Sequence, residues 1–206
     1  MRLFKIFTVS ALLLGSAVAV NAQDSSNSDL SASFGVKGGV NFATLNGNDI
    51  DNVNSRTSFH VGVFTELPVS SMFSVQAEAL YSGQGAEADF RGGDGDKAEF
   101  QLDYINVPVL AKFYIMEGLS LEAGPQFSFL VNEEFDFNPN SNDGDIDLEN
   151  TRYEANSFDF GVAGGLTFQT PMGLFATARY VQGITEIYDD ADIKNSVFQI
   201  GVGFKF

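Results

Sequence analysis

The chain ends on the sequence SVFQIGVGFKF, residues 196–206. From Phe198 onward, large apolar residues occupy the even positions, while glutamine, glycine and lysine occupy the odd positions. A period of two is typical of a β-strand, and here one face of the strand is fully apolar. A soluble protein rarely leaves such a strand exposed at the edge of a sheet. We therefore interpret residues 196–206 as the closing strand of a transmembrane β-barrel.

Seven earlier segments alternate in the same way, which predicts strands at residues 32–42, 59–67, 73–82, 100–113, 119–131, 158–168 and 174–182. Long connections at 45–57, 83–99, 132–156 and 183–195 alternate with short turns at 68–72, 116–118 and 170–173. Outer-membrane barrels have this pattern, with long loops outside the cell and short turns in the periplasm. The sequence thus predicts an all-β fold, an eight-stranded antiparallel up-and-down transmembrane β-barrel over residues 32–206.

Three positions predict irregularities in these strands. The apolar residues change from even to odd numbers between Tyr104 and Ile105, which predicts a β-bulge there. Pro125 cannot donate a ladder hydrogen bond and predicts a local break, and Pro68 predicts the end of its strand.

The first 22 residues are typical of a signal peptide. Arg2 and Lys5 precede an apolar run, and Val20-Asn21-Ala22 forms a small-residue cleavage site. The apolar run is too short for a membrane helix. We expect cleavage after Ala22, a short N-terminal segment at 23–31, and location in the outer membrane of a Gram-negative bacterium.

The acidic composition limits the possible partners and cofactors. The net charge is −16, and without Arg2 and Lys5 it becomes −16 − 2 = −18. Nucleic acid is therefore an unsuitable partner, because phosphate binding requires many lysine and arginine residues. Cysteine is absent, which excludes disulfides and thiolate sites. We expect no cofactor and no catalytic residues. We expect the barrel to be embedded in the lipid of the outer membrane.

If the apolar faces contact lipid, the other faces fill the lumen. From the lumen positions of each predicted strand we single out one ionisable residue, and these are Lys37, Glu66, Glu78, Lys112, Glu122, Asp159, Arg179 and Lys205. Four are positive and four negative. The favoured interpretation is a neutral polar plug, because an eight-stranded barrel has room only for its own side chains. A turn centred on Glu117 would place Lys112 opposite Glu122, where they could form an ion pair.

Three alternatives remain open. Charged rings can also select ions, so a narrow pore or uptake channel is the second hypothesis. An outer-membrane enzyme is the third; it would depend on His60, the single histidine, but no paired motif supports it. A soluble lipocalin-like barrel is the alternative fold, and the large apolar set with its terminal Phe206 disfavours it.

The longest predicted loop contains a weak calcium signature. Asn138, Asn140, Asn142 and Glu149 have the spacing of a calcium loop, but Asp143 stands where the turn glycine belongs. The alternating acids Asp143, Asp145, Asp147 and Glu149 are the candidate ligands. A solvated acidic loop is the favoured interpretation.

Several motifs resemble a known family. They are GVKGGVNFATL (35–45), DYINVPVLAKFY (103–114), GPQFSFL (124–130), FGVAGGL (160–166), ARY (178–180) and the terminal FQIGVGFKF. In this order they resemble the PorT-like or porin-family outer-membrane β-barrel proteins of Bacteroidetes. The resemblance implies a barrel assembled by the outer-membrane insertion machinery, which reads a C-terminal aromatic residue such as Phe206. It implies no substrate, so we expect a structural or surface-interaction role through the acidic loops, with an unknown surface partner.

Overall fold

The computed structural model describes residues 31–47, 53–89, 97–136, 145–147, 156–187 and 193–206. The predicted signal peptide lies outside these ranges, as do Asp143 and Glu149 of the predicted calcium loop.

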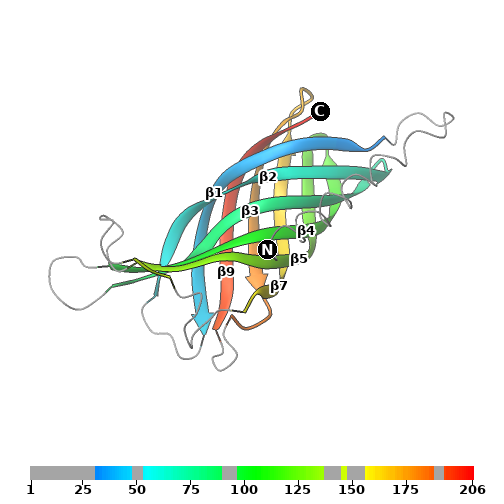
Figure 1. Cartoon of the computed structure of the whole chain (residues 1–206). Coiled ribbons are helices and arrows are strands. Elements are labelled where there is room, and N and C mark those ends of the chain that lie inside the picture. The colour runs from blue at the N-terminus through cyan, green and yellow to red at the C-terminus, as the bar shows by residue number, and fades with distance from the viewer. Residues whose placement is uncertain (1–30, 48–52, 90–96, 137–144, 148–155, 188–192) are drawn as a thin grey trace, which may run out of the picture.

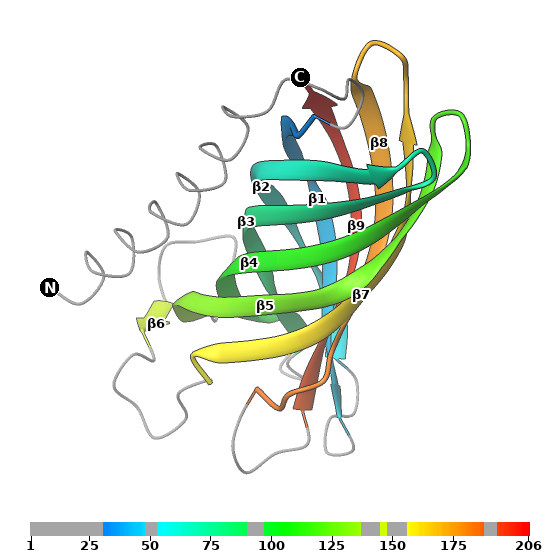
Figure 2. The ribbon, with the colours of Figure 1, turned by 90° about the vertical axis from the view of Figure 1, so that its right-hand side faces the viewer.

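The fold is a closed β-barrel in which every neighbouring pair of strands is antiparallel (Figure 1). The strands are β1 (Ser33–Gly47), β2 (Val53–Ser70), β3 (Phe73–Asp89), β4 (Lys97–Met116), β5 (Leu119–Asp136), β6 (Asp145–Asp147), β7 (Phe158–Gln169), β8 (Leu174–Gly183) and β9 (Ile193–Lys205). Eight of them form the barrel, as the sequence predicted. β6 is a three-residue addition that pairs with the end of β5 (Figure 2).

The last strand closes the barrel against the first. β9 pairs with β1 from Gly35↔Lys205 to Gly47↔Ile193. The amide of Phe206 donates a hydrogen bond of 2.8 Å to the carbonyl of Phe34, so the pairing continues to the last residue. The prediction that residues 196–206 form the closing strand is confirmed.

The polarity of the wall is the reverse of that in a soluble protein. On β9, Ile200 and Val202 face outward with exposed fractions of 51% and 61%, whereas Gln199 between them is 2% exposed. This arrangement is stable only where lipid surrounds the barrel and side chains fill the lumen. Among the described residues, no helix is long and apolar enough to cross a membrane.

The two ends of the barrel differ. The short turns after β2, β4 and β7 lie at one end with the C-terminus, here called the short-turn end (Figure 1). The opposite end, where β1, β3, β5 and β8 end, is here called the long-loop end. In outer-membrane barrels the short-turn end faces the periplasm.

The strands at the long-loop end are longer than predicted. β3 and β4 run through 83–89 and 97–99, inside the predicted loop 83–99; β1, β2, β5 and β9 also extend into predicted loops. The β5–β7 register ends at Phe129↔Phe158, but the β4–β5 register continues to Glu99↔Asp136. A ribbon of β3, β4 and β5 therefore extends past the end of β7 (Figure 1). Its glycine- and acid-rich sequence predicted a loop, but pairing with long neighbours overrides weak strand propensity.

The sequence predicted a bulge in β4 at Tyr104 and Ile105, but the structure has it in the neighbouring strand β5. β4 alternates without a break, and Leu102, Tyr104 and Asn106 all point inward and are buried. The register shift is at Asp103/Tyr104, where the partners Asn132 and Leu130 leave Val131 of β5 as the extra residue. Leu102 and Tyr104 are apolar because the inner face itself becomes apolar near the long-loop end.

The two prolines have different outcomes. As predicted for Pro125, the β4–β5 ladder is interrupted, between Pro108↔Gln126 and Ala111↔Ala123. Pro68 does not end its strand, since β2 continues to Ser70 with a register shift after Pro68.

Gly203 on β9 leaves room for the inward-facing ring of Phe175 on β8. A Cβ at Gly203 would lie 2.3 Å from the Phe175 ring and 2.5 Å from the Val36 carbonyl oxygen. We expect Gly203→Val to destabilise the folded barrel by about 1–3 kcal/mol through overpacking. Urea unfolding in lipid vesicles measures the change. Gly164→Val is the matched control, because a Cβ at Gly164 meets only the Glu122 carbonyl oxygen, at 3.9 Å; equal losses for both variants would contradict the prediction.

Candidate functional site: the charged lumen

The structure places the eight ionisable residues of the lumen positions at two levels of burial. Seven of them are 1–6% exposed, namely Lys37, Glu66, Glu78, Lys112, Glu122, Asp159 and Arg179. The side chain of Lys205, close to the C-terminus, is 18% exposed.

Arg179 of β8 is the centre of the larger charge cluster. Its Nη1 and Nη2 donate hydrogen bonds of 2.8 and 2.7 Å to the two carboxylate oxygens of Glu78 on β3. Its Nε donates one of 2.7 Å to Glu122 on β5. Lys37 of β1 also lies 3.3 Å from Glu78. Two cations and two anions from four strands thus meet in the lumen, with the planar fork geometry that suits arginine.

A second cluster lies nearer the short-turn end, around Glu66 of β2. The Lys112 ammonium donates 2.9 and 3.0 Å hydrogen bonds to Glu66 and to the amide oxygen of Gln76. Lys205 lies 3.5 Å from Glu66. The hydroxyls of Ser74 and Tyr114 donate to the same carboxylate. This cluster has two cations for one anion.

The register sets Lys112 opposite Glu122, but each binds a different partner. The Lys112 ammonium binds Glu66, and the Glu122 carboxylate accepts hydrogen bonds from Arg179 and from the Thr167 hydroxyl, at 3.0 Å. The expected ion pair across the turn is therefore replaced by contacts with residues of other strands. Sequence position along neighbouring strands defines opposite residues on the wall; it does not define contacts across the barrel.

Asp159 lies apart from both clusters, near the long-loop end. Its carboxylate accepts a 2.5 Å hydrogen bond from the Thr185 hydroxyl, and it is in none of the ion pairs found between described residues. The charges of the eight residues sum to zero, but the residues do not form four separate ion pairs.

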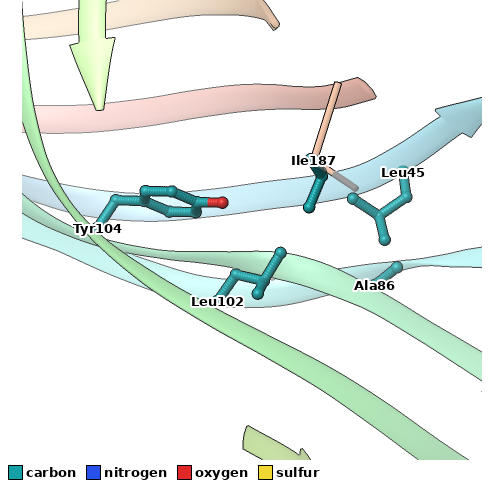
Figure 3. Packing of buried hydrophobic residues seen from close by; sticks show 5 residues of the cluster. All are labelled: Leu45, Ala86, Leu102, Tyr104 and Ile187. Atoms are coloured by element: carbon teal, nitrogen blue, oxygen red, sulfur yellow. The ribbon is translucent and has the colours of Figure 1, made fainter. Parts of the chain in front are cut away.

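Apolar side chains lie on both sides of the Arg179 cluster. Toward the short-turn end, the rings of Phe64 and Phe175 pack edge to face, with 5.4 Å between centroids and 80° between planes. At the long-loop end, a buried cluster points into the lumen (Figure 3) and consists of Leu45, Ala86, Leu102, Tyr104 and Ile187. Sequence reasoning missed both, although Phe64 and Phe175 stand on the polar faces of their strands.

Uncharged polar residues occupy the level between the charges and the apolar cluster. His60 Nδ1 lies 2.7 Å from Asn41 Oδ1. Because its partner is an amide, His60 forms neither a serine–histidine nor a histidine–carboxylate pair with the described residues. Across the described ranges, no group of three histidine, aspartate or glutamate residues could hold a metal ion. The side chains of Asp145 and Asp147 are not among those described.

The family model for the outer membrane protein beta-barrel domain matches residues 21–189. The chain belongs to this family. As a member, it is an integral protein of the outer membrane, and lipid surrounds its apolar wall.

Two solved structures are similar to this outer-membrane barrel. Neisserial surface protein A is 14% identical, with 85% of this chain and 99% of that chain covered and a TM-score of 0.54. Ail, the attachment invasion locus protein of Yersinia pestis, is 15% identical, with 86% and 100% covered and a TM-score of 0.51. At this identity the likeness shows the fold alone. A search of curated proteins finds no match.

We expect Arg179→Met to destabilise the barrel by roughly 3–5 kcal/mol, since Glu78 and Glu122 would lose their shared buried partner. Lys205→Met removes the same charge from a partly solvated position with one contact of 3.5 Å, so a loss below about 1 kcal/mol is expected. Urea unfolding midpoints in lipid vesicles compare the two variants. Equal losses of unfolding free energy in the two variants would show that the Arg179 contacts are not the main stabilising contacts in the lumen.

Proposed function

We propose that this outer-membrane barrel is a closed membrane anchor with a structural or surface-interaction role, and that it is neither a pore nor an enzyme. The observation that supports this is the arrangement of the lumen. Arg179 joins strands on different sides of the barrel, and apolar side chains lie on both sides of its cluster.

The filling of the lumen argues against conduction. The space bounded by Lys37, Phe64, Lys112 and Phe175 is too narrow to hold a water molecule. An ion passing through would have to break the hydrogen bonds between Arg179 and both glutamates. Charged rings that conduct ions must bind them weakly enough to release them.

In planar bilayers, we expect the wild-type barrel to give no single-channel steps. The double variant Glu78→Ala/Arg179→Ala removes one anion and one cation from the central cluster and should give measurable steps, which also proves that the barrel has inserted. Val202→Ala, on the lipid face, is the control that should remain silent. Regular steps from the wild type would reject the closed anchor and support the pore hypothesis.

The surface-interaction role is supported by the projecting ribbon of β3, β4 and β5. Residues 132–156, which include the end of β5, contain eight acidic residues and one basic residue. We propose that the ribbon and this acidic stretch bind positively charged surfaces, because opposite charges on the two sides of an interface attract each other.

The Ail structure was also determined with the heparin analogue sucrose octasulfate. We expect this chain not to bind that polyanion, because its net charge is −16. A lysine-rich peptide should instead bind, with an affinity that falls as salt rises. Fluorescence polarisation with barrels in detergent measures both.

The double variant Glu99→Gln/Asp136→Asn should weaken binding of the lysine-rich peptide severalfold. Glu117→Gln changes the charge at the short-turn end and is the control that should leave binding unchanged. Tight binding of sucrose octasulfate by the wild type would contradict the proposed cationic partner.

We also propose that a signal peptide is cleaved after Ala22 and that the protein is of the PorT-like type found in Bacteroidetes. We propose that the insertion machinery recognises Phe206. The Phe206 side chain is 72% exposed and packs 5.7 Å from the Phe204 ring. A terminal aromatic residue is thus accessible on the lipid side of the closing strand.

A further inference from the structure

The lumen contains buried polar atoms whose partners are missing from the protein. His60 Nε2, both amide atoms of Asn106, and Gln126 Oε1 have no hydrogen-bond partner among the described residues. Each of these three side chains is at most 3% exposed. Buried polar groups are almost always hydrogen-bonded, to protein or to ordered water, so these atoms require a partner.

The chemistry of His60 follows from the residues around it. The Asn41 amide nitrogen donates to the carbonyls of Gly83 at 2.7 Å and Phe59 at 3.2 Å, which fixes the orientation of the amide. Asn41 Oδ1 therefore faces His60 Nδ1, 2.7 Å away, and Nδ1 must carry the proton to donate to it. His60 Nε2 is then an unprotonated acceptor that needs a donor.

The two amides also require outside partners. Both side-chain atoms of Asn106 lack one, so rotating its amide by 180° would leave the same deficit. Gln126 donates from Nε2 to the Ser128 hydroxyl at 3.3 Å and has a free oxygen. The unmet set is three acceptors and one amide donor group, which requires a ligand that both donates and accepts.

The strand register brings the three residues to one level of the lumen. Asn106 stands opposite Leu80 of β3, and His60 stands opposite Ser82, the next inward residue of the same strand. Asn106 also stands opposite Ser128 of β5, and Gln126 is the next inward residue there. On β3 this level lies between Glu78 of the charge cluster and Ala86 of the apolar cluster.

A side chain at position 201 would crowd the histidine. A Cβ at Gly201 would lie 3.0 Å from His60 Nε2, 3.1 Å from the Gly38 carbonyl oxygen and 3.4 Å from Thr177 Cγ2. A methyl group there would therefore compete with a water molecule for contact with His60 Nε2.

We propose that this level of the lumen is a hydration site, in which ordered water molecules bind His60 Nε2 and the side-chain amides of Asn106 and Gln126. Water supplies donors to the three acceptors and accepts from Asn106. The site is closed on one side by the charge cluster and on the other by the apolar cluster, so its water exchanges slowly with the solvent.

NMR of the barrel in lipid nanodiscs tests the site directly. Magnetisation transfer from water should reach the side-chain amide protons of Asn106, while those of Asn41, which the protein satisfies, serve as the internal control. Gly201→Ala should reduce the occupancy beside His60; Gly164→Ala, on the lipid face, should leave it unchanged. No transfer from water to Asn106 in the wild type would overturn the proposal.

Asn106→Leu gives an independent result whose sign separates the two cases. With water bound, the substitution removes satisfied hydrogen bonds, and the unfolding equilibrium constant should rise about 5- to 30-fold. In a dry lumen it would remove unsatisfied atoms, and the barrel would become more stable. A raised unfolding midpoint in urea would therefore overturn the proposal.

Discussion

The hydrogen bonds from Arg179 to Glu78 and Glu122 are the contacts on which the interior depends. They join β8 to β3 and β5, strands that are not neighbours in the wall. Most large apolar side chains of this barrel face lipid, so apolar packing inside it is limited to small buried clusters. Contacts across the lumen must therefore supply what a core supplies elsewhere, and a buried cation with two buried anions does so only when each member keeps its partners.

Most charged residues of the inner face lie toward the short-turn end, and the buried apolar cluster around Leu102 and Tyr104 lies toward the long-loop end. The buried inward residues of β3 after Glu78 include Leu80, Ser82, Gln84 and Ala86; those of β4 before Lys112 include Leu110, Asn106, Tyr104 and Leu102. The apolar stretch begins where the ribbon leaves the wall. Beyond the lipid, the outer side of a strand meets water, so the side facing the lumen becomes the one that is apolar.

This change explains what the sequence could and could not predict. The number of strands, their antiparallel order and the closure by residues 196–206 follow from a period of two, which holds wherever one face meets lipid. The bulge was misplaced because Leu102 and Tyr104 kept the period while the apolar face moved inward. The partners of Lys112 and Glu122 could not be found, because contacts across a lumen depend on stagger between distant strands. His60, the single histidine and so the candidate catalytic base, is hydrogen-bonded to the side-chain amide of Asn41.

The positions of the lumen charges follow from the cost of burying them. The central cluster of Lys37, Glu78, Glu122 and Arg179 is balanced, with two cations and two anions. The surplus cation is Lys205, whose side chain retains 18% exposure at the short-turn end, where water can solvate it. Asp159 lies on the second residue of β7, at the opposite end, with a hydroxyl as partner. An uncompensated charge costs more when it is buried away from water than when water can solvate it. Neutrality is therefore required locally in the middle of the lumen, while the two ends only need to balance over the length of the barrel.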